Sequence, residues 1–333
     1  MIGSTFQVLR TLGIPSLVEG NPFVDVMPEC LHKASVNKVD LFYLETLAKF
    51  NRIDSSDAEL CILRNKRKKI LELAVFLGEI FWENKISYAI MKTLKPFPYA
   101  GADVDVIIET PRDFSRAVKV LKERNFVLLG HDLFSATMFR QDFGVNVDLQ
   151  LEISVSGLPY LNKNMILSNS IDRKINGFSV KTLAGFSEVV AIACHSFYKE
   201  HMYTLADFYS AVLSVTKENS EELCALAKST NSVVAVSALL AWTRRVAGEA
   251  FGANLPGIDA TLNVLGHHAL AKLLVYGDFE FPLKFPKSFV VLSLMNKIFE
   301  DKYARSSLAS SLSNSFSRKQ FRALINHFNR DSY

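Results

Sequence analysis

Two aspartates one residue apart are the part of this sequence best suited to chemistry. Asp103 and Asp105 belong to the run Asp103-Val104-Asp105-Val106-Ile107-Ile108, which is typical of a strand. Because side chains alternate along a strand, both carboxylates lie on one face, and Val104 and Val106 lie on the other. Two neighbouring carboxylates repel each other and raise one pKa sharply unless a cation lies between them. The pair therefore predicts a divalent metal ion or a strongly basic partner.

A third carboxylate belongs to another predicted strand. Residues 144–153 alternate, with apolar side chains on one face and Asn146, Asp148, Gln150 and Glu152 on the other. If this strand lies beside the first, Asp148 joins the two aspartates. Three carboxylates on a sheet form a platform for Mg²⁺, which takes oxygen ligands and leaves positions open for substrate phosphates. An isolated D-x-D has a simpler alternative, in which the acids are solvated at an exposed strand edge.

The elements that position these strands follow from capping, periodicity and proline. A helix is predicted over residues 56–84, because a capping-type start at Ser55-Ser56-Asp57-Ala58-Glu59 precedes apolar residues at helical spacing. Residues 86–91 read as a strand that ends before Pro96 and Pro98. Residues 111–125 form an amphipathic helix after the D-x-D strand.

The second half of the chain is helical in character. After Leu183 we expect helices over 187–199, 203–217, 220–227, 233–247, 260–276 and 318–328. The expected fold class is α+β, with a small mixed β-sheet domain that carries flanking helices. The predicted domains are a helical N-terminal segment (1–84), the sheet domain (85–185) and an all-helical C-terminal domain (186–333).

Composition excludes two classes of protein. With 333 residues, 49% hydrophobic and 22% charged, the chain can bury a sizeable core and is not disordered. Its longest nearly apolar stretch, 232–242, is shorter than the roughly 18 residues that a membrane span needs. No secretory signal pattern begins the sequence, so we expect a cytoplasmic protein without a membrane partner. Four distant cysteines, expected to be buried and reduced, signal neither disulfides nor zinc: Cys30, Cys61, Cys194 and Cys224.

The net charge of +4 is small but unevenly distributed. Residues 64–69 hold five basic side chains in six, and residues 297–333 hold seven Lys or Arg against three acids. Each of these two basic patches is most simply a solvated helix face. The alternative is a polyanionic partner such as nucleic acid.

The order of these elements resembles the nucleotidyltransferase superfamily, which includes DNA polymerase beta, tRNA CCA-adding enzymes and small antibiotic-modifying transferases. The resemblance covers roughly residues 86–209 and rests on the D-x-D, the Asp of the third strand and the helical appendage. The stretch Lys92-Thr93-Leu94-Lys95-Pro96-Phe97-Pro98-Tyr99 is also similar to one in uncharacterised archaeal nucleotidyltransferase-like proteins.

The resemblance implies roles for particular residues. Asp103, Asp105 and Asp148 would bind two Mg²⁺ ions and help activate a hydroxyl that displaces pyrophosphate from a nucleoside triphosphate. The family holds the phosphates with a Gly-Ser pair ahead of the D-x-D, and here Lys92-Thr93 stands in that place without a glycine. The remaining candidates for the nucleotide are Lys92, Thr93, Lys95 and Lys199, followed by Tyr99, Gln150, His195 and Asp207.

Structural alternatives accompany the second group. Tyr99 is either a stacking partner for a base or a packed aromatic of the turn. His195 and Lys199 are four residues apart on one predicted helix, and they and Asp207 are either close to the nucleotide or part of a polar stripe between helices.

Two functions from different classes follow. The first is Mg²⁺-dependent transfer of a nucleoside monophosphate to a hydroxyl of an unidentified acceptor, with RNA and protein among the candidates. The second is a catalytically inactive module of the same fold that binds nucleic acid or a protein partner through the basic patches. The missing Gly-Ser favours the module, whereas three acids on correctly phased strands favour the enzyme.

Overall fold

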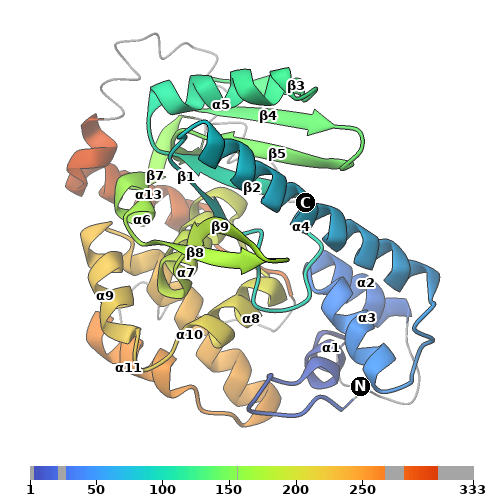
Figure 1. Ribbon diagram of the computed structural model, residues 1–333. Coiled ribbons are helices and arrows are strands. Elements are labelled where there is room, and N and C mark those ends of the chain that lie inside the picture. Colours follow the sequence, from blue (N-terminus) through green and yellow to red (C-terminus); the bar gives the residue numbers. More distant parts are fainter. Residues whose placement is uncertain (1–3, 22–27, 156, 267–280, 307–333) are drawn as a thin grey trace.

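The computed structural model describes residues 4–21, 28–155, 157–266 and 281–306, and it has the expected α+β architecture (Figure 1). The helices are α1 (Ser4–Leu12), α2 (Pro28–Val36), α3 (Asp40–Lys49), α4 (Ala58–Glu83), α5 (Pro111–Glu123), α6 (Lys163–Leu167), α7 (Gly185–Cys194), α8 (Leu205–Ser214), α9 (Ser220–Ser229), α10 (Val233–Phe251), α11 (Pro256–Leu265) and α13 (Lys287–Glu300), with a π-helical segment η1 (His195–Glu200). The strands are β1 (Tyr88–Met91), β2 (Asp103–Ile108), β3 (Val127–His131), β4 (Ser135–Arg140), β5 (Val145–Gln150), β6 (Ile153–Val155), β7 (Leu158–Leu161), β8 (Ser170–Ile175), β9 (Phe178–Leu183), β10 (Met202–Tyr203) and β11 (Leu283–Lys284).

One mixed sheet positions the three aspartates. Its strand order is β3-β4-β5-β2-β1-β9-β8. Strand β2 runs antiparallel to β1 and parallel to β5, and Asp105 lies opposite Asp148 in that register. The condition set by the sequence, that the Asp148 strand lie beside the D-x-D strand, is therefore met.

The two faces of the sheet pack against different helices. Val104, Val106 and Ile108 share a core with α4 and α5, which lie together on one face. Met91 and Ile107 on the opposite face join a second core with the C-terminal helices. The alternation of side chains along β2 then directs Asp103 and Asp105 to the side of those C-terminal helices.

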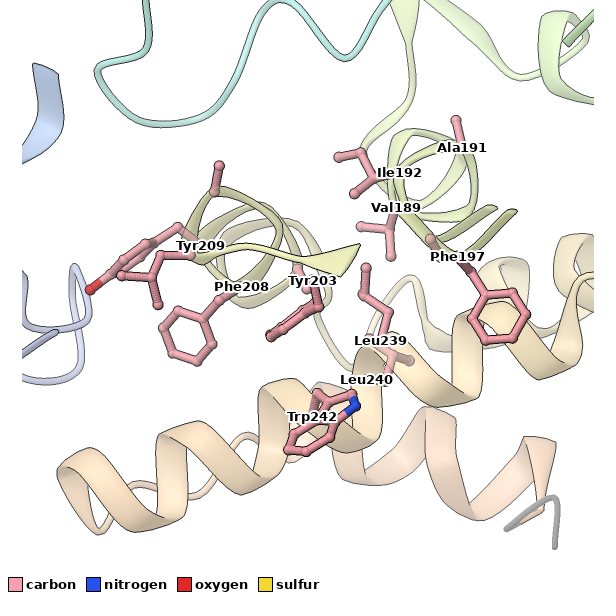
Figure 2. Packing of buried hydrophobic residues seen from close by; sticks show 14 of the residues in the cluster. Val189, Ala191, Ile192, Phe197, Tyr203, Phe208, Tyr209, Leu239, Leu240 and Trp242 are labelled. Carbon is pink, nitrogen blue, oxygen red and sulfur yellow. The ribbon is translucent and has the colours of Figure 1, made fainter. Parts of the chain in front are cut away.

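The helical half forms a rigid support for that side. Figure 2 shows Val189 and Ile192 of α7, Phe197 of η1 and Leu239 of α10 converging in one apolar cluster. The N-terminal helices join the same core. In addition, the Tyr209 hydroxyl of α8 donates to the carbonyl of Gly13, directly after α1, at 2.8 Å. Nothing in the hydrophobic pattern of the sequence predicted this contact between distant segments.

Several elements differ from the sequence-based prediction. Of the observed strands, only β1, β2 and β5 were predicted, whereas β3, β4 and β6 to β11 were not. Strand β3 is an edge strand with Val127 60% and Leu129 58% exposed, and β8 is exposed along most of its length, so neither shows the alternation that burial imposes. Helix α11 begins at Pro256, earlier than predicted. The predicted continuation to 276 and the helix at 318–328 lie outside the described residues.

Two smaller expectations can be compared directly. Cys30, Cys194 and Cys224 are buried free thiols, but Cys61 is exposed on α4, where the expectation of burial was wrong. Among the described helices, none combines the length and the apolar character needed to cross a membrane.

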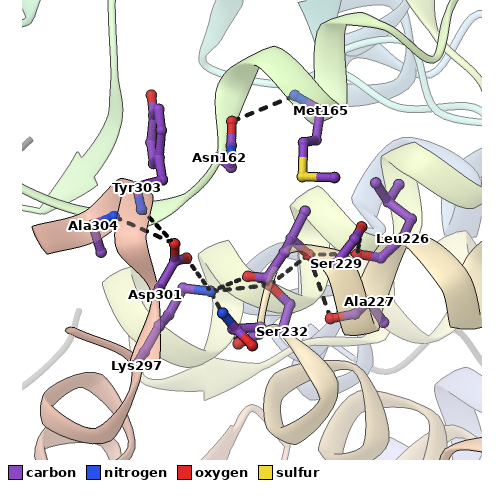
Figure 3. A network of polar contacts seen from close by, with 12 residues as sticks. Asn162, Met165, Leu226, Ala227, Ser229, Ser232, Lys297, Asp301, Tyr303 and Ala304 are labelled. Carbon is purple, nitrogen blue, oxygen red and sulfur yellow. Dashed lines mark hydrogen bonds and ion pairs between the residues drawn. The ribbon is translucent and has the colours of Figure 1, made fainter. Parts of the chain in front are cut away.

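A buried lysine ties α13 to the rest of the helical half. The Lys297 ammonium donates to the carbonyls of Thr230 and Asn231, the latter at 3.0 Å, and lies 3.8 Å from Asp301 (Figure 3). The carbonyls of Thr230 and Asn231 lie at the C-terminal end of α9. A cation at this position also interacts favourably with the negative end of the helix dipole. Burial lowers the pKa of Lys297, and Asp301 opposes that change.

Replacing Lys297 by Met is therefore expected to lower the free energy of unfolding by about 1.5–3 kcal/mol, the range for hydrogen bonds to a charged group. Urea unfolding monitored by circular dichroism measures this loss. Lys302→Met is the matched control, because Lys302 is exposed one turn further along and its replacement should change little. Equal stabilities of the two variants would contradict the assigned role of Lys297.

Candidate active site

A cavity of about 340 Å³ lies where the sheet, the N-terminal helices and the C-terminal helices meet. Asp103, Asp105 and Asp148 line it from β2 and β5. Five lysines also line it, although they come from distant parts of the chain: Lys38, Lys66, Lys92, Lys95 and Lys199. Of the predicted candidates, only Gln150 is absent from the lining. The structure thus brings the predicted residues together around one polar space.

Both carboxylate oxygens of Asp105 have a partner within the chain. The Lys92 ammonium lies 3.0 Å from its Oδ2, and the Gln150 side-chain amide donates to its Oδ1 at 2.6 Å. Burial raises the pKa of Asp105, but the positive charge of Lys92 and its hydrogen bond outweigh burial and hold that pKa below its ordinary value. The D-x-D predicted either a metal ion or a basic partner for its carboxylates. For Asp105, the chain itself supplies the basic partner, which is Lys92.

Asp103 and Asp148 are not neutralised in this way. Burial, followed by repulsion from Asp105 and Asp148, raises the pKa of Asp103 to about 6. Within the described part of the chain, the Asp148 Oδ1 is buried and has no hydrogen-bond partner. A buried carboxylate oxygen without a partner is costly, because it has lost water without gaining a bond. The arrangement suits a positively charged or proton-donating ligand at these two residues.

Magnesium fits these residues in a particular way. Over the described ranges, no group of three or more His, Cys, Asp or Glu side chains is placed to hold a metal ion. Mg²⁺ does not require such a cage, since it is commonly bound by one or two carboxylates together with substrate phosphates. Asp103 and Asp148 provide that minimal set, whereas both oxygens of Asp105 already have partners.

The loop after β1 aims Lys92 into the cavity. Lys92 has a positive φ of 58°, and its backbone N–H donates to the Glu188 Oε1 of α7 at 2.6 Å. A left-handed conformation is uncommon outside glycine and needs support from surrounding contacts. Glu188 gives that support. Burial lowers the pKa of nearby Lys95, and the charge of Glu188 opposes this lowering.

His195 extends the polar chain from Lys92 to η1. Its Nδ1 lies 3.2 Å from the Lys92 ammonium, and its Nε2 lies 3.1 Å from Glu200. A neutral ring with its proton on Nε2 satisfies both contacts, because Nδ1 then accepts from Lys92 and Nε2 donates to Glu200. Burial, then the charge of Lys92, lowers the pKa of His195 to about 3, although Glu200 opposes this.

This lowered pKa predicts acid-sensitive folding. The unfolded chain takes up a proton at His195 near pH 6.5, whereas the native state does so only near pH 3, so the contribution of His195 to stability is complete above 6.5 and is lost below it. By itself this contribution falls by about 1.4 kcal/mol per pH unit in that window, and the raised pKa of Asp103, which is the same in the variants compared, acts in the opposite direction. Urea unfolding at several pH values should show a shallower decline for His195→Gln than for the wild type. His32→Gln, at an exposed position, should follow the wild type, and identical slopes in all three would contradict the prediction.

Other predicted residues have visible structural roles. The Thr93 hydroxyl donates to the Met91 carbonyl and accepts from the Asp105 N–H, both at 3.1 Å, so it is engaged within the chain. Asp207 accepts from the backbone N–H and the hydroxyl of Thr204, both at 2.9 Å, and so caps the start of α8. Tyr99 packs in the turn, 6.2 Å from Phe97 between ring centroids, and its ring faces the Lys95 ammonium.

Sequence reasoning gave no role in the site to several charged residues that shape it, and it placed Lys66 only in a basic patch. Glu188 and Glu200 orient Lys92 and His195, and Lys38 and Lys66 line the cavity from the N-terminal half. Glu188 carried a usable signal, because it is the one charged residue of the otherwise apolar helix α7. Lys66 carried only the signal of the basic patch 64–69 and Lys38 carried none, since the packing of α2, α3 and α4 is what brings both to the cavity.

No protein-family model and no curated protein matches the sequence. Among solved structures, an antigenic nucleotidyltransferase-like protein from Paracoccidioides brasiliensis aligns with a TM-score of 0.35 and 16% identity, over 56% of this chain and 94% of that one. At this TM-score, neither residues nor activity can be transferred from that protein. The resemblance to the archaeal group stays a prediction.

Proposed function

We propose that the protein transfers a nucleoside monophosphate from a Mg²⁺-bound nucleoside triphosphate to a hydroxyl group of an acceptor. One observation carries the proposal: three carboxylates on neighbouring strands and five lysines line the same cavity. A triphosphate with its cation needs both signs of charge within one site, since the phosphates seek cations and the metal seeks carboxylates. Phosphoryl transfer depends mainly on such positioning and charge neutralisation.

The lysines divide the work of holding the phosphates. Lys199 on η1, Lys38 in the turn between α2 and α3, and Lys66 on α4 all line the cavity. Lys92 differs, because its charge is shared with Asp105 and it keeps that carboxylate in place. In this proposal Lys199, Lys38 and Lys66 bind the triphosphate, whereas Lys92 holds the Asp105 carboxylate in position.

Two carboxylates act on the reacting groups. Asp103 and Asp148 would hold Mg²⁺, whose charge would offset the negative charge that develops on the phosphate oxygens. The Asp148 carboxylate lines the cavity and accepts the proton of the acceptor hydroxyl. The hydroxyl oxygen forms a bond to the α-phosphorus, the bond to the bridging oxygen breaks, and pyrophosphate leaves with that electron pair.

Thermal unfolding with each of the four nucleoside triphosphates, with and without Mg²⁺, tests the proposal. A ligand present at 100 times its Kd stabilises the native state by about 2.7 kcal/mol, which raises the melting temperature by several degrees. The shift should require Mg²⁺ and should disappear in Asp103→Asn/Asp148→Asn. The matched control is Asp172→Asn/Asp142→Asn, at two exposed positions outside the cavity. Absence of a shift with every triphosphate would overturn the proposal.

A binding module without turnover is the second candidate. The observation that favours it is the occupation of both Asp105 oxygens and of the Thr93 hydroxyl by partners within the chain. This candidate predicts salt-dependent binding of nucleic acid without any stabilisation by triphosphates. The thermal unfolding experiment therefore separates the two candidates.

A further inference from the structure

A second cavity, of about 240 Å³, adjoins the first and has a different charge. Thr93, Lys95 and Tyr99 line both cavities, so the two share one wall. Four cations line the second cavity, namely Arg67, Lys95, Arg173 and Lys174, and no acidic residue lines it. The first cavity suits a metal-bound substrate, whereas the second suits an anion without a metal.

The cations of this second cavity are available to a ligand. Within the described part of the chain, Arg67, Arg173 and Lys174 form no ion pair. One Arg173 nitrogen, Nη1, donates to the Leu94 carbonyl at 2.8 Å, which fixes the guanidinium beside the loop after β1. A guanidinium has five N–H donors, so most of them remain for an oxyanion. Arginine held in this way is suited to phosphate, which it binds through two parallel hydrogen bonds.

Helix α4 connects the two cavities and continues beyond them. On this helix, Lys66 lines the first cavity and the next residue, Arg67, lines the second. Lys68 and Lys69 follow on the same helix, and their ion pairs with Glu72, at 3.9 and 3.4 Å, are exposed and weak. Lys66 and Arg67 thus place a cation in each of two adjoining cavities, which matches a ligand with phosphates in both rather than a single phosphate.

We propose that this second cavity binds a phosphodiester of a single-stranded nucleic acid, whose terminal hydroxyl then lies in the first cavity as the acceptor. The inference rests on the proposed transfer reaction and names its acceptor class. Tyr99 lines both cavities, and the Lys95 ammonium lies over its ring, so an aromatic ring and a cation stand together at the junction where a base would lie. Cations along the backbone combined with an aromatic platform are the usual means of binding single strands.

Fluorescence anisotropy with a short fluorescein-labelled single-stranded RNA, without triphosphate, tests the inference on the full chain. Arg67→Ala/Arg173→Ala should weaken binding by about tenfold or more. It should also reduce the slope of log affinity against log salt by about 1.4, since each phosphate contact to a single strand contributes about 0.7. Arg67→Lys/Arg173→Lys should recover most of that slope, because it keeps both charges.

The matched control is Arg112→Ala/Arg124→Ala, which removes the same charge from α5 and its C-terminal cap outside both cavities. Equal losses in the two double variants would overturn the inference, because net charge alone would then explain the binding. Competition by inorganic phosphate or a nucleoside monophosphate as strong as that by unlabelled RNA would also overturn it, in favour of a small phosphate ligand.

The outcome is separable from that of the proposed function. Arg67→Ala/Arg173→Ala should keep the Mg²⁺-dependent thermal shift with triphosphates, because neither arginine lines the first cavity. A retained shift with RNA affinity equal to that of the wild type would overturn the acceptor site alone. Loss of the shift in the wild type would instead overturn the transfer reaction.

Discussion

Asp148→Asn is expected to lower the rate of Mg²⁺-dependent nucleotidyl transfer by about 10²–10³-fold, the size of effect seen when one preorganised electrostatic group is removed from a transition state. The side chain keeps its shape but loses the charge that holds the cation and accepts the proton. Pyrophosphate release in the presence of each triphosphate and single-stranded RNA measures the rate.

The same variant should fold at least as stably as the wild type. Asp148 contributes a buried oxygen without a partner in the described chain, and its charge repels Asp103. Removing that charge relieves an unfavourable interaction, so the melting temperature should stay equal or rise. Asp172→Asn on β8 is the control, since Asp172 is exposed and lies outside the cavity. A transfer rate that matches this control would remove Asp148 from the reaction.

Lys92→Met is expected to have the largest effect on stability. It removes the ammonium 3.0 Å from Asp105, and both side chains are nearly buried, with exposures of 12% and 11%. Breaking a buried ion pair from one side leaves an uncompensated charge and typically costs about 3–5 kcal/mol. His195 also loses the ammonium that contacts its Nδ1. Urea unfolding should therefore show a strongly reduced midpoint.

A double-mutant cycle isolates the ion pair from other effects of the substitution. Asp105→Asn introduced into Lys92→Met should restore part of the lost stability, because the remaining partner is then neutral. Lys119→Met is the control, since Lys119 pairs with Glu123 at 3.9 Å on an exposed helix face and such pairs contribute little. A coupling energy near zero in the cycle would show that Lys92 and Asp105 do not depend on each other.

Much of the site was predictable because short-range geometry determines it. Alternation along a strand places Asp103 and Asp105 on one face, and it places Asp148 and Gln150 together on the polar face of β5. Capping at Asp57 and helical spacing predicted α4, and the same reasoning predicted α5. These inferences need only the side-chain periods of strands and helices, which are the same in every protein.

The remainder depended on contacts between residues far apart in the chain. The position of helices α1 to α3 depends on the shared apolar core and on the Tyr209 hydrogen bond, which hold them beside the C-terminal helices. This packing brings Lys38 to the cavity. The pairing of Lys92 with Asp105, rather than with a phosphate, depends on Glu188, which is 96 residues away along the chain.

The sequence by itself determined which side chains could meet on the sheet, because strand periodicity is local. Only the tertiary structure decided which charges neutralise one another. Coulomb interactions depend on distance and burial, and the sequence contains neither. The D-x-D therefore predicted a cation, and the fold assigned Lys92 to Asp105, whereas the Asp148 Oδ1 has no partner within the described residues.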